Sequence, residues 1–322
     1  MPKESLAFSA YLGAMAQARL IFGTVQLGQT YGAANRIGLP SENAAHNLIH
    51  RALELGVTTF DTAQAYGLAE ERLGAALDDS IAKLAHVVTK LSPNGSDAVG
   101  SIEASLSNLR TRSLDTLMLH RAEHIDVREI WDDLRARHEN GEIKHLGVSV
   151  QTPHELLRVL KDHDVTHIQM PYNILDWRWR TAEVASAISH RPDVIVHVRS
   201  AYLQGLFAAG LQANWPQVDG VSPEHVVSAL EHLTHEFGRQ SPADLCLAYL
   251  RAQGWINGIV VGMESEDQLE SNVRLFAKAP LTLDQCATAE EVLPKLPEQF
   301  LNPALWPPAK PAHEMFSTPI LK

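Results

Sequence analysis

The chain alternates short β-type runs with amphipathic helical segments about every 30 residues, and it does so eight times. Short apolar runs that alternate with helices indicate parallel strands joined by helical crossovers. The strands are expected to start near positions 20, 57, 87, 114, 144, 166, 194 and 258. Eight such units favour a closed barrel over an open sheet. The predicted fold class is therefore α/β, a parallel eight-stranded (β/α)8 TIM barrel.

Capping residues and glycines mark the helices between these strands. Ser41 is expected to cap a helix that Gly56 ends, because a serine hydroxyl accepts free backbone amides and glycine adopts the left-handed conformation. The sequence Thr152-Pro153-His154-Glu155 is a second helix start. We also predict one helix over residues 179–190 and a long irregular loop over residues 205–221.

A length of 322 residues fits one barrel of about 250 residues with added loops and a tail. We therefore expect a single domain over residues 1–322, with its core at about 19–280 and a Pro-rich surface tail at about 293–322. Residues 6–18 end in a sequence similar to a signal-peptidase site, but their polar residues favour a plug at the bottom of the barrel. No apolar run reaches the roughly 18 residues of a transmembrane helix.

The charge and cysteine content restrict the partners. A net charge of −11 argues against nucleic acid or an anionic membrane as the main partner. Cys246 and Cys286 have no metal-ligand spacing and indicate no disulfide framework, so we expect a reducing, cytoplasmic location and no metal. The expected partner is a small carbonyl substrate, and the expected state is a monomer or a small homo-oligomer.

Four polar residues follow successive predicted strands: Asp61, Tyr66, Lys90 and His120. Side chains at the C-terminal ends of barrel strands converge on one site. Each residue alone has an ordinary structural explanation, as a helix cap, a core residue or a solvated charge, but the set is poorly explained by chance. We interpret it as a proton-transfer group.

This set suits one reaction. A lysine ammonium makes a nearby phenol a better proton donor, an aspartate keeps the lysine charged, and a histidine can orient a carbonyl oxygen. The phenol would protonate the oxygen of a C=O group while a nicotinamide or flavin cofactor delivers a hydride to the carbon. Because no Gly-x-Gly-x-x-Gly motif follows the first strand, a nucleotide would be held in another way.

The motif Phe60-Asp61-Thr62-Ala63-Gln64-Ala65-Tyr66-Gly67, followed by Glu70 and Leu73-Gly74, resembles the signature of the aldo-keto reductase superfamily. The resemblance extends from Leu20 to about Phe276. It implies a (β/α)8 barrel and a catalytic tetrad formed by the four polar residues above. In this interpretation Tyr66 is the general acid in reduction and the general base in oxidation.

The resemblance also implies contacts with the nicotinamide nucleotide. They are carried by Gly23, Thr24, Asp61, Ser149, Gln169, Arg199, Ser200, Leu203, Gly205, Gly262, Glu264, Gln268 and Asn272. Val150 replaces the family asparagine that follows the serine of strand five. Arg199 stands where an aromatic ring often stacks on the nicotinamide, and a guanidinium plane can also stack.

Residues 261–272 resemble the adenosine-phosphate loop and helix of this family. NADPH-specific members place Lys or Arg here against the 2′-phosphate, but this chain has no cation between Gly262 and Asn272 and carries Glu264, Glu266 and Asp267 instead. A helix N-terminus can still bind phosphate weakly. The family favours NADP(H), and the missing cation makes NAD(H) possible, with a weak or reversed preference.

Tyr31, Arg121 and a loop around Trp177 are the predicted substrate contacts. With Arg36 and Arg199 they make the barrel mouth polar and cationic, which favours a sugar-like or anionic carbonyl over a steroid or long apolar aldehyde. Alternatively, Arg36 and Arg121 pair with loop carboxylates. Two other functions stay open: a cofactor-binding redox sensor or partner subunit with slow turnover, like the β subunits of potassium channels, and a lactol dehydrogenase running the same chemistry in reverse.

Overall fold

The computed structural model describes residues 18–35, 37–78, 81–92 and 98–307. The predicted N-terminal plug, Arg36 and the last part of the Pro-rich tail lie outside the described residues. Eight strands form a closed barrel in sequence order, which confirms the predicted fold class. The strands are β1 (Arg19–Gly23), β2 (Thr59–Asp61), β3 (His86–Leu91), β4 (Leu114–Leu119), β5 (Ile143–Ser149), β6 (His167–Pro171), β7 (Ile195–Arg199) and β8 (Gly258–Gly262).

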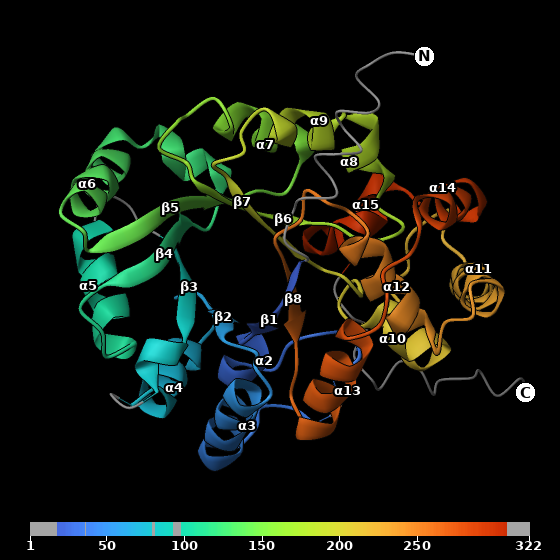
Figure 1. Ribbon diagram of the computed structural model, residues 1–322, viewed down its shortest axis with the longest axis horizontal. Helices are drawn as coiled ribbons and strands as arrows, with labels where there is room; N and C mark the ends of the chain where they lie inside the picture. The colour runs from blue at the N-terminus through green and yellow to red at the C-terminus, as the bar shows by residue number, and fades with distance from the viewer. Residues whose placement is uncertain (1–17, 36, 79–80, 93–97, 308–322) are drawn as a thin grey trace, which may run out of the picture.

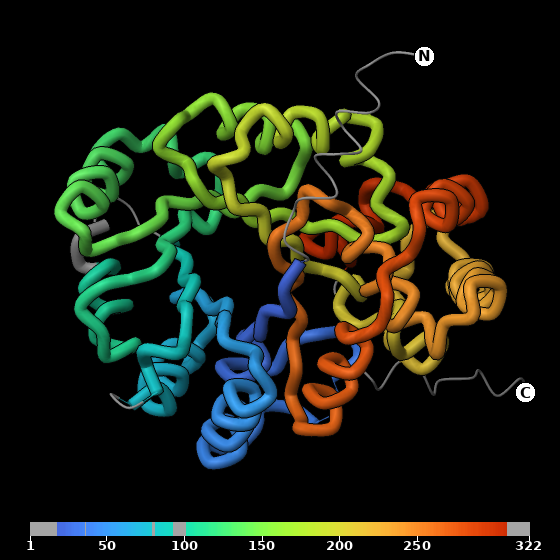
Figure 2. Tube along the Cα trace, in the orientation of Figure 1, coloured from blue at the N-terminus to red at the C-terminus, as the bar shows by residue number. Residues whose placement is uncertain are grey.

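All neighbouring strands pair in parallel, including β1 and β8, which are the first and last strands along the chain. Arg19 lies opposite Gly258 and Gly23 lies opposite Gly262, so Gly23 and Gly262 end the two adjacent strands. Figure 2 shows this closure, with the blue start of the trace beside the orange segment of β8. Closure brings every C-terminal strand end to one face, where side chains can form a single site.

Helices surround the barrel (Figure 1). Those between or after the strands are α2 (Val25–Gly28), α3 (Glu42–Glu54), α4 (Ala69–Ala76), α5 (Ala98–Asn108), α6 (Arg128–Glu139), α7 (Pro153–Val159), α8 (Trp177–Thr181), α9 (Val184–Ser189), α10 (Leu206–Ala209), α11 (Pro223–Glu236), α12 (Pro242–Arg251), α13 (Glu266–Phe276), α14 (Leu283–Val292) and α15 (Glu298–Leu301). Short 3-10 turns are η1 (Ala82–Leu84), η2 (Ala122–Asp126), η3 (Gly210–Gln212) and η4 (Pro303–Leu305).

The helix starts follow the predicted capping chemistry. Ser41 Oγ accepts a hydrogen bond from the Ala44 amide at 3.3 Å. Thr152 and Glu155 form a reciprocal capping box at the start of α7, with the Glu155 amide donating to Thr152 Oγ1 at 3.2 Å. These bonds satisfy backbone amides that have no partner inside the helix. In α3 the residues Ala45, Leu48 and Ile49 form the buried, apolar side.

Three local predictions were wrong. The helix predicted over residues 179–190 is two helices, α8 and α9, because Glu183 adopts a left-handed conformation with φ 53° between them. The segment around Trp177, predicted as a loop, is helix α8. Residues 205–221 are not wholly irregular, since α10 and η3 lie within them.

The first residues of the predicted tail pack against the rest of the protein. Leu296 and Phe300 are buried, and the Phe300 ring stacks between those of Trp215 and Trp306. Aromatic burial of this size accounts for the order of a Pro-rich segment. Within the described residues, no helix combines the length and apolar character that a membrane crossing requires.

Candidate active site

Lys90 is the centre of the hydrogen-bonded group at the C-terminal face. Its Nζ donates to Asp61 Oδ1 at 2.9 Å, to Asp61 Oδ2 at 2.8 Å and to the Thr62 carbonyl at 2.8 Å. It also lies 3.3 Å from the Tyr66 hydroxyl. The structure therefore brings three of the four predicted catalytic residues into direct contact.

The backbone explains why these side chains meet. Asp61 ends β2, Lys90 lies near the end of β3, and Asp61 and Val88 are paired neighbours across the two strands. Tyr66 is carried by the turn that follows β2, and this turn packs directly against α2. A Cβ placed on Gly28 would lie 1.7 Å from the Tyr66 carbonyl oxygen, so only glycine permits this close approach.

Burial and pairing together set the charge of Lys90. Its side chain is fully buried. Burial lowers the pKa of Lys90, but the charge of Asp61 and the hydrogen bonds to Asp61 and Tyr66 raise it by more, so the net pKa lies above its ordinary value. The ammonium form therefore persists at neutral pH and faces the Tyr66 hydroxyl.

His120, the fourth predicted residue, follows β4 and lies beside the tyrosine. Its ring centroid is 5.9 Å from that of Tyr66, in an edge-to-face arrangement, and its Nδ1 lies 2.9 Å from Ser92 Oγ. Burial, with the charges of Lys90, Arg199 and Arg121, lowers the pKa of His120 to about 3. The imidazole is therefore neutral at physiological pH and can serve as a hydrogen-bond donor without carrying charge.

Gln169 and Ser149 extend this group along the next strands. Gln169 Nε2 donates to Asp61 Oδ1 at 2.6 Å, and Ser149 is paired with Gln169 between β5 and β6. Within the described residues, Gln169 Oε1 is buried and has no hydrogen-bond partner. A buried acceptor without a partner is costly, so this atom fits an external N–H group such as that of a carboxamide.

The loop after β7 has an unusual backbone. Ser200, Leu203 and Gln204 have φ values of 65°, 44° and 56°, and Gly205 has 89°. Positive φ values at non-glycine residues cost energy and cluster at ligand-binding segments. A Cβ on Gly205 would lie 2.6 Å from that of Ala34, so the loops after β1 and β7 are in contact.

At the start of β1's loop, Thr24 Oγ1 donates to the Asp61 carbonyl at 3.0 Å. A Cβ on the neighbouring Gly23 would lie 3.1 Å from Val260 Cγ1. A Cβ on Gly262 would lie 2.3 Å from Gln26 Nε2, so the Gln26 side chain lies against this strand end. The structure thus groups Gly23, Thr24 and Gly262, while sequence reasoning missed Gln26.

The end of β8 and the start of α13 form a closed hydrogen-bonded pair. The Glu264 amide donates to Gln268 Oε1 at 3.0 Å, and Gln268 Nε2 donates to Glu264 Oε1 at 3.3 Å. Burial raises the pKa of Glu264, although the bond from Gln268 lowers it in part. Asn272 accepts the Tyr202 hydroxyl at 2.9 Å, which links α13 to the β7 loop.

The predicted substrate residues are placed differently from one another. Partial burial raises the pKa of Tyr31 above its ordinary value, although the charge of Arg199 partly opposes this shift. Tyr66 also raises the pKa of Tyr31, so Tyr31 lies within electrostatic reach of the tetrad. Arg121 is exposed and lies 3.6 Å from Glu123. Trp177 donates its indole N–H to the Leu296 carbonyl at 2.8 Å, and Lys295 lies over its ring. Its described contacts are therefore with the C-terminal segment.

Ser92 and Gln64 are site residues that sequence reasoning did not select. Ser92 Oγ contacts His120, and the Ser92 amide donates to Gln64 Oε1 at 3.2 Å. The available signal was position: Ser92 lies two residues after Lys90 at a strand end, and Gln64 lies inside the motif between Asp61 and Tyr66. Strand-end loops of a barrel face the same site.

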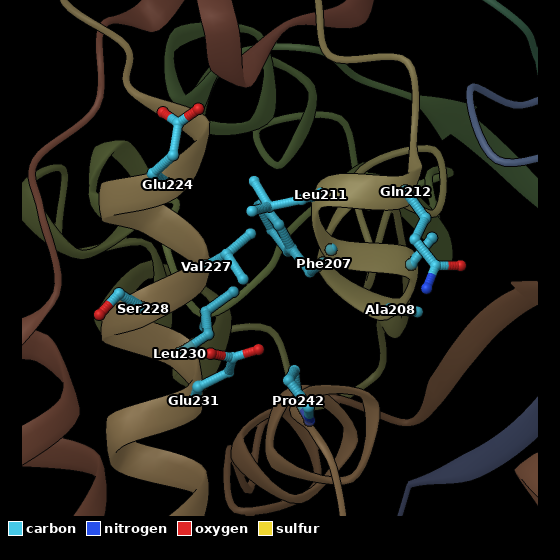
Figure 3. A pocket seen from close by; sticks show the side chains of 12 residues that line it. Phe207, Ala208, Leu211, Gln212, Glu224, Val227, Ser228, Leu230, Glu231 and Pro242 are labelled. Carbon is cyan, nitrogen blue, oxygen red and sulfur yellow. The ribbon is translucent and has the colours of Figure 1, made fainter.

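A hollow of about 450 Å³ lies elsewhere, between α10, η3 and α11 (Figure 3). Phe207, Leu211, Val227 and Leu230 supply apolar walls, and Glu224 and Glu231 lie along α11. None of its lining residues belongs to the predicted tetrad or cofactor set. The candidate active site is therefore identified by its buried, hydrogen-bonded ionisable residues rather than by this hollow.

Comparison with known proteins agrees with this geometry. Residues 19–294 match the model of the aldo/keto reductase family. Oxidoreductase YdhF of Escherichia coli K12 is 32% identical over 127 residues, which cover 33% of this chain and 43% of that protein. The L-glyceraldehyde 3-phosphate reductase of the same organism is 24% identical over 82% of this chain and 86% of its own length.

Solved structures share the fold. The holo form of aldo-keto reductase AKR11C1 from Bacillus halodurans superposes with a TM-score of 0.71 at 23% identity, over 88% of this chain and 97% of that one. The glycerol dehydrogenase AKR11B4 from Gluconobacter oxydans gives a TM-score of 0.68 at 22% identity, over 87% and 94%. The match of the family model to residues 19–294 establishes that the chain belongs to the aldo/keto reductase family and is an NAD(P)-dependent oxidoreductase.

Proposed function

We propose that the protein reduces a polar aldehyde or ketone, with Tyr66 as the general acid that protonates the carbonyl oxygen. The proposed role of Tyr66 rests on the position of its hydroxyl, 3.3 Å from the buried Lys90 ammonium. Asp61 holds this ammonium with two hydrogen bonds. A cation beside a phenol stabilises the phenolate that proton donation leaves behind. In oxidation the same phenolate accepts the proton from the alcohol.

The other site residues position the carbonyl. The neutral His120 imidazole lies edge-on to the Tyr66 ring and can donate a hydrogen bond to the oxygen that Tyr66 protonates. A donor aimed at an oxygen that gains negative charge stabilises the transition state more than the ground state. Asp61 holds Lys90 in place, and Gln169 donates to Asp61 Oδ1 in turn.

The residues present fit a nicotinamide nucleotide. Gln169 Oε1 is a buried acceptor without a partner among the described residues, and Ser149 lies beside it on the paired strand. We propose that these two residues hold the carboxamide, and that Arg199, Ser200, Leu203 and Gly205 hold the segment that follows. When bound, the nucleotide supplies the hydride.

The protein segment predicted to contact the adenosine end of the nucleotide supports NADH as an acceptable or preferred cofactor. Glu264 and Gln268 bond to each other at the start of α13, and no described residue between Gly262 and Asn272 is a cation. A half-buried carboxylate repels a 2′-phosphate and accepts a ribose hydroxyl instead. The proposal predicts that kcat/KM for NADPH does not greatly exceed that for NADH.

The charge-reversal variant Glu264→Arg tests this preference directly. It should raise kcat/KM for NADPH relative to NADH by up to about fivefold, because a partly exposed ion pair contributes about 1 kcal/mol or less. Glu291→Arg, an exposed reversal on α14, is the matched control and should leave the ratio unchanged. A wild-type preference for NADPH beyond about a thousandfold, equivalent to about 4 kcal/mol, would contradict the proposal.

A sugar-like or anionic carbonyl is the proposed substrate class. Arg199 acts on both Tyr31 and His120, so a cation lies at the mouth of the site beside the tetrad. The relative named L-glyceraldehyde 3-phosphate reductase supports a short, polar, anionic substrate. We therefore expect short hydroxyaldehydes and their phosphates to be better substrates than long apolar aldehydes.

Absorbance of the reduced nicotinamide tests the reaction itself. Each nucleotide is offered with a reactive aromatic aldehyde and then with a panel of aldoses and phosphorylated hydroxyaldehydes. Tyr66→Phe should bind the nucleotide normally, because the substitution removes only the hydroxyl, and should lose turnover. Wild-type rates in this variant would refute the role of Tyr66, while tight nucleotide binding without turnover in the wild type would favour a sensor.

A further inference from the structure

His120 is connected to a buried carboxylate through Ser105, Gln64 and Ser92, by side-chain hydrogen bonds and one bond from the Ser92 backbone amide. Glu70 of α4 is buried and accepts Thr89 Oγ1 at 2.6 Å and Ser105 Oγ at 2.8 Å. Gln64 Nε2 donates to Ser105 Oγ at 3.0 Å and to the Ser101 carbonyl. Both donor positions of the Gln64 amide nitrogen are thereby occupied, which orients its oxygen.

The same amide oxygen determines where Ser92 lies. Gln64 Oε1 accepts the Ser92 backbone amide at 3.2 Å, just after β3 ends at Leu91. The His120 amide in turn donates to the Leu91 carbonyl at 2.9 Å, so the backbones of the two segments are tied together. The Ser92 hydroxyl then lies 2.9 Å from His120 Nδ1.

This contact bears on which ring nitrogen of His120 carries the hydrogen. A neutral imidazole has one N–H, and a hydrogen bond at one nitrogen selects the tautomer at the other. If the serine hydroxyl donates to Nδ1, the hydrogen of the ring stays on Nε2. Only that tautomer can donate to a carbonyl oxygen, because the opposite one would present a lone pair to it.

We propose that Ser92, held by Gln64, is a positioning residue that fixes His120 as the Nε2–H tautomer and so makes it a hydrogen-bond donor to the substrate oxygen. This inference rests on the proposed function of the tetrad and deepens it. No bond is broken at His120: Tyr66 gives the proton, the nucleotide gives the hydride, and the histidine contributes a hydrogen bond that strengthens as the oxygen becomes negative.

Because His120 is neutral, its tautomer must be fixed if the ring is to donate a hydrogen bond to the substrate. Because its pKa is lowered to about 3, the ring does not carry hydrogens on both nitrogens at neutral pH. A histidinium would donate from either nitrogen and would need no tautomer control. Burial and the neighbouring cations Lys90, Arg199 and Arg121 keep it neutral, so its donor ability depends on the hydrogen bond at Nδ1.

The test combines kinetics with a direct measurement of the tautomer. Ser92→Ala should lower kcat roughly 3- to 10-fold, the range expected for one lost net hydrogen bond, with little change in KM for the carbonyl. Ser92→Thr keeps the hydroxyl and should restore most of kcat. Ser241→Ala, which removes the capping hydroxyl of α12, is the matched control for the structural loss of a serine and should keep kcat.

Nitrogen-15 NMR of the histidine rings reports the tautomer without any turnover. The wild-type signals of His120 are identified as those that disappear in His120→Gln. They should show the Nε2–H pattern, and in Ser92→Ala they should shift toward a mixture of tautomers. Gln64→Leu, which frees Ser92 from its anchor, should shift them in the same direction. This second variant keeps the test open if Ser92→Ala folds poorly.

The outcomes separate the two proposals. An Nδ1–H pattern in the wild type, or unchanged signals and unchanged kcat in Ser92→Ala, would overturn the role of Ser92 even if Tyr66 proves to be the acid. Absence of Tyr66-dependent turnover in the wild type would refute the proposed function, and the NMR experiment would still decide the tautomer.

Discussion

The buried Asp61–Lys90 pair allows a quantitative test of how the site is held together. The two charges are 2.8 Å apart, and both side chains are almost completely buried. At an effective dielectric constant of about 20, Coulomb attraction at this distance is about 6 kcal/mol. Desolvation cancels much of this gain, so the pair contributes far less to net stability than the attraction itself.

Removing one partner is different from removing both. Asp61→Asn leaves a buried ammonium, and Lys90→Met leaves a buried carboxylate, so each single variant should lose about 3–5 kcal/mol of unfolding free energy. Asp61→Asn/Lys90→Met removes both charges and should be more stable than the sum of the single losses by at least about 2 kcal/mol. All three variants should lose turnover, since Lys90 is either absent or no longer held beside Tyr66 by the Asp61 carboxylate.

Urea unfolding of the nucleotide-free protein at pH 7 measures these values, because bound nucleotide would add its own stabilisation. Equal m-values across the series would show that the denatured states are comparable. Thr234→Val, which removes one buried hydroxyl of α11, gives a control for a neutral polar loss away from the site. Single losses below about 1 kcal/mol, or strict additivity in the double variant, would refute the reasoning.

Three further predictions concern packing, pH and the substrate. Gly28→Ala should destabilise the protein by about 2–3 kcal/mol and reduce turnover, because the new Cβ would lie 1.7 Å from the Tyr66 carbonyl oxygen. Thermal unfolding measures the stability and steady-state kinetics measure kcat. Unchanged values of both would contradict the close approach. Burial lowers the pKa of His197 to about 3, below its ordinary value of 6.5, so the unfolded chain takes up the proton first and stability falls as pH decreases from about 6.5. This group alone should cost about 2.5 kcal/mol between pH 7 and pH 4.5, and urea unfolding of His197→Leu at both values should show a correspondingly smaller loss than the wild type. Arg121→Ala should leave stability within about 0.5 kcal/mol, because its pair with Glu123 is exposed, and should raise KM for a phosphorylated hydroxyaldehyde more than for the neutral sugar; an equal effect on both would remove Arg121 from substrate recognition.

The fold and the centre of the site could be predicted from local patterns. The eightfold alternation of strand and helix signals is a consequence of which residues can be buried on a pleat or on a helix face, and burial dominates folding. Once a barrel is predicted, its strand ends must share one face, so Asp61, Lys90 and His120 are brought together by topology alone. This is why their contacts could be anticipated without coordinates.

Other features depend on contacts between segments far apart in the chain. The split between α8 and α9 follows from the left-handed conformation of Glu183, which no glycine or proline announces. The bond from Gln169 to Asp61 joins residues 108 positions apart, and the link from Ser92 to His120 joins residues 28 positions apart. Side-chain partners of this kind are selected by packing in three dimensions, where several polar groups compete for each donor and acceptor.

The sequence by itself determined the barrel and the family, and it predicted the four residues of the candidate tetrad, because each is encoded by short-range periodicity or by a compact motif. Only the tertiary structure decided that the Gln26 side chain lies against Gly262, that Glu264 and Gln268 bond to each other, and that Trp177 lies against the C-terminal segment. The physical reason is the range of the forces: periodic burial acts along each element, whereas hydrogen-bond partners depend on how loops from different strands meet.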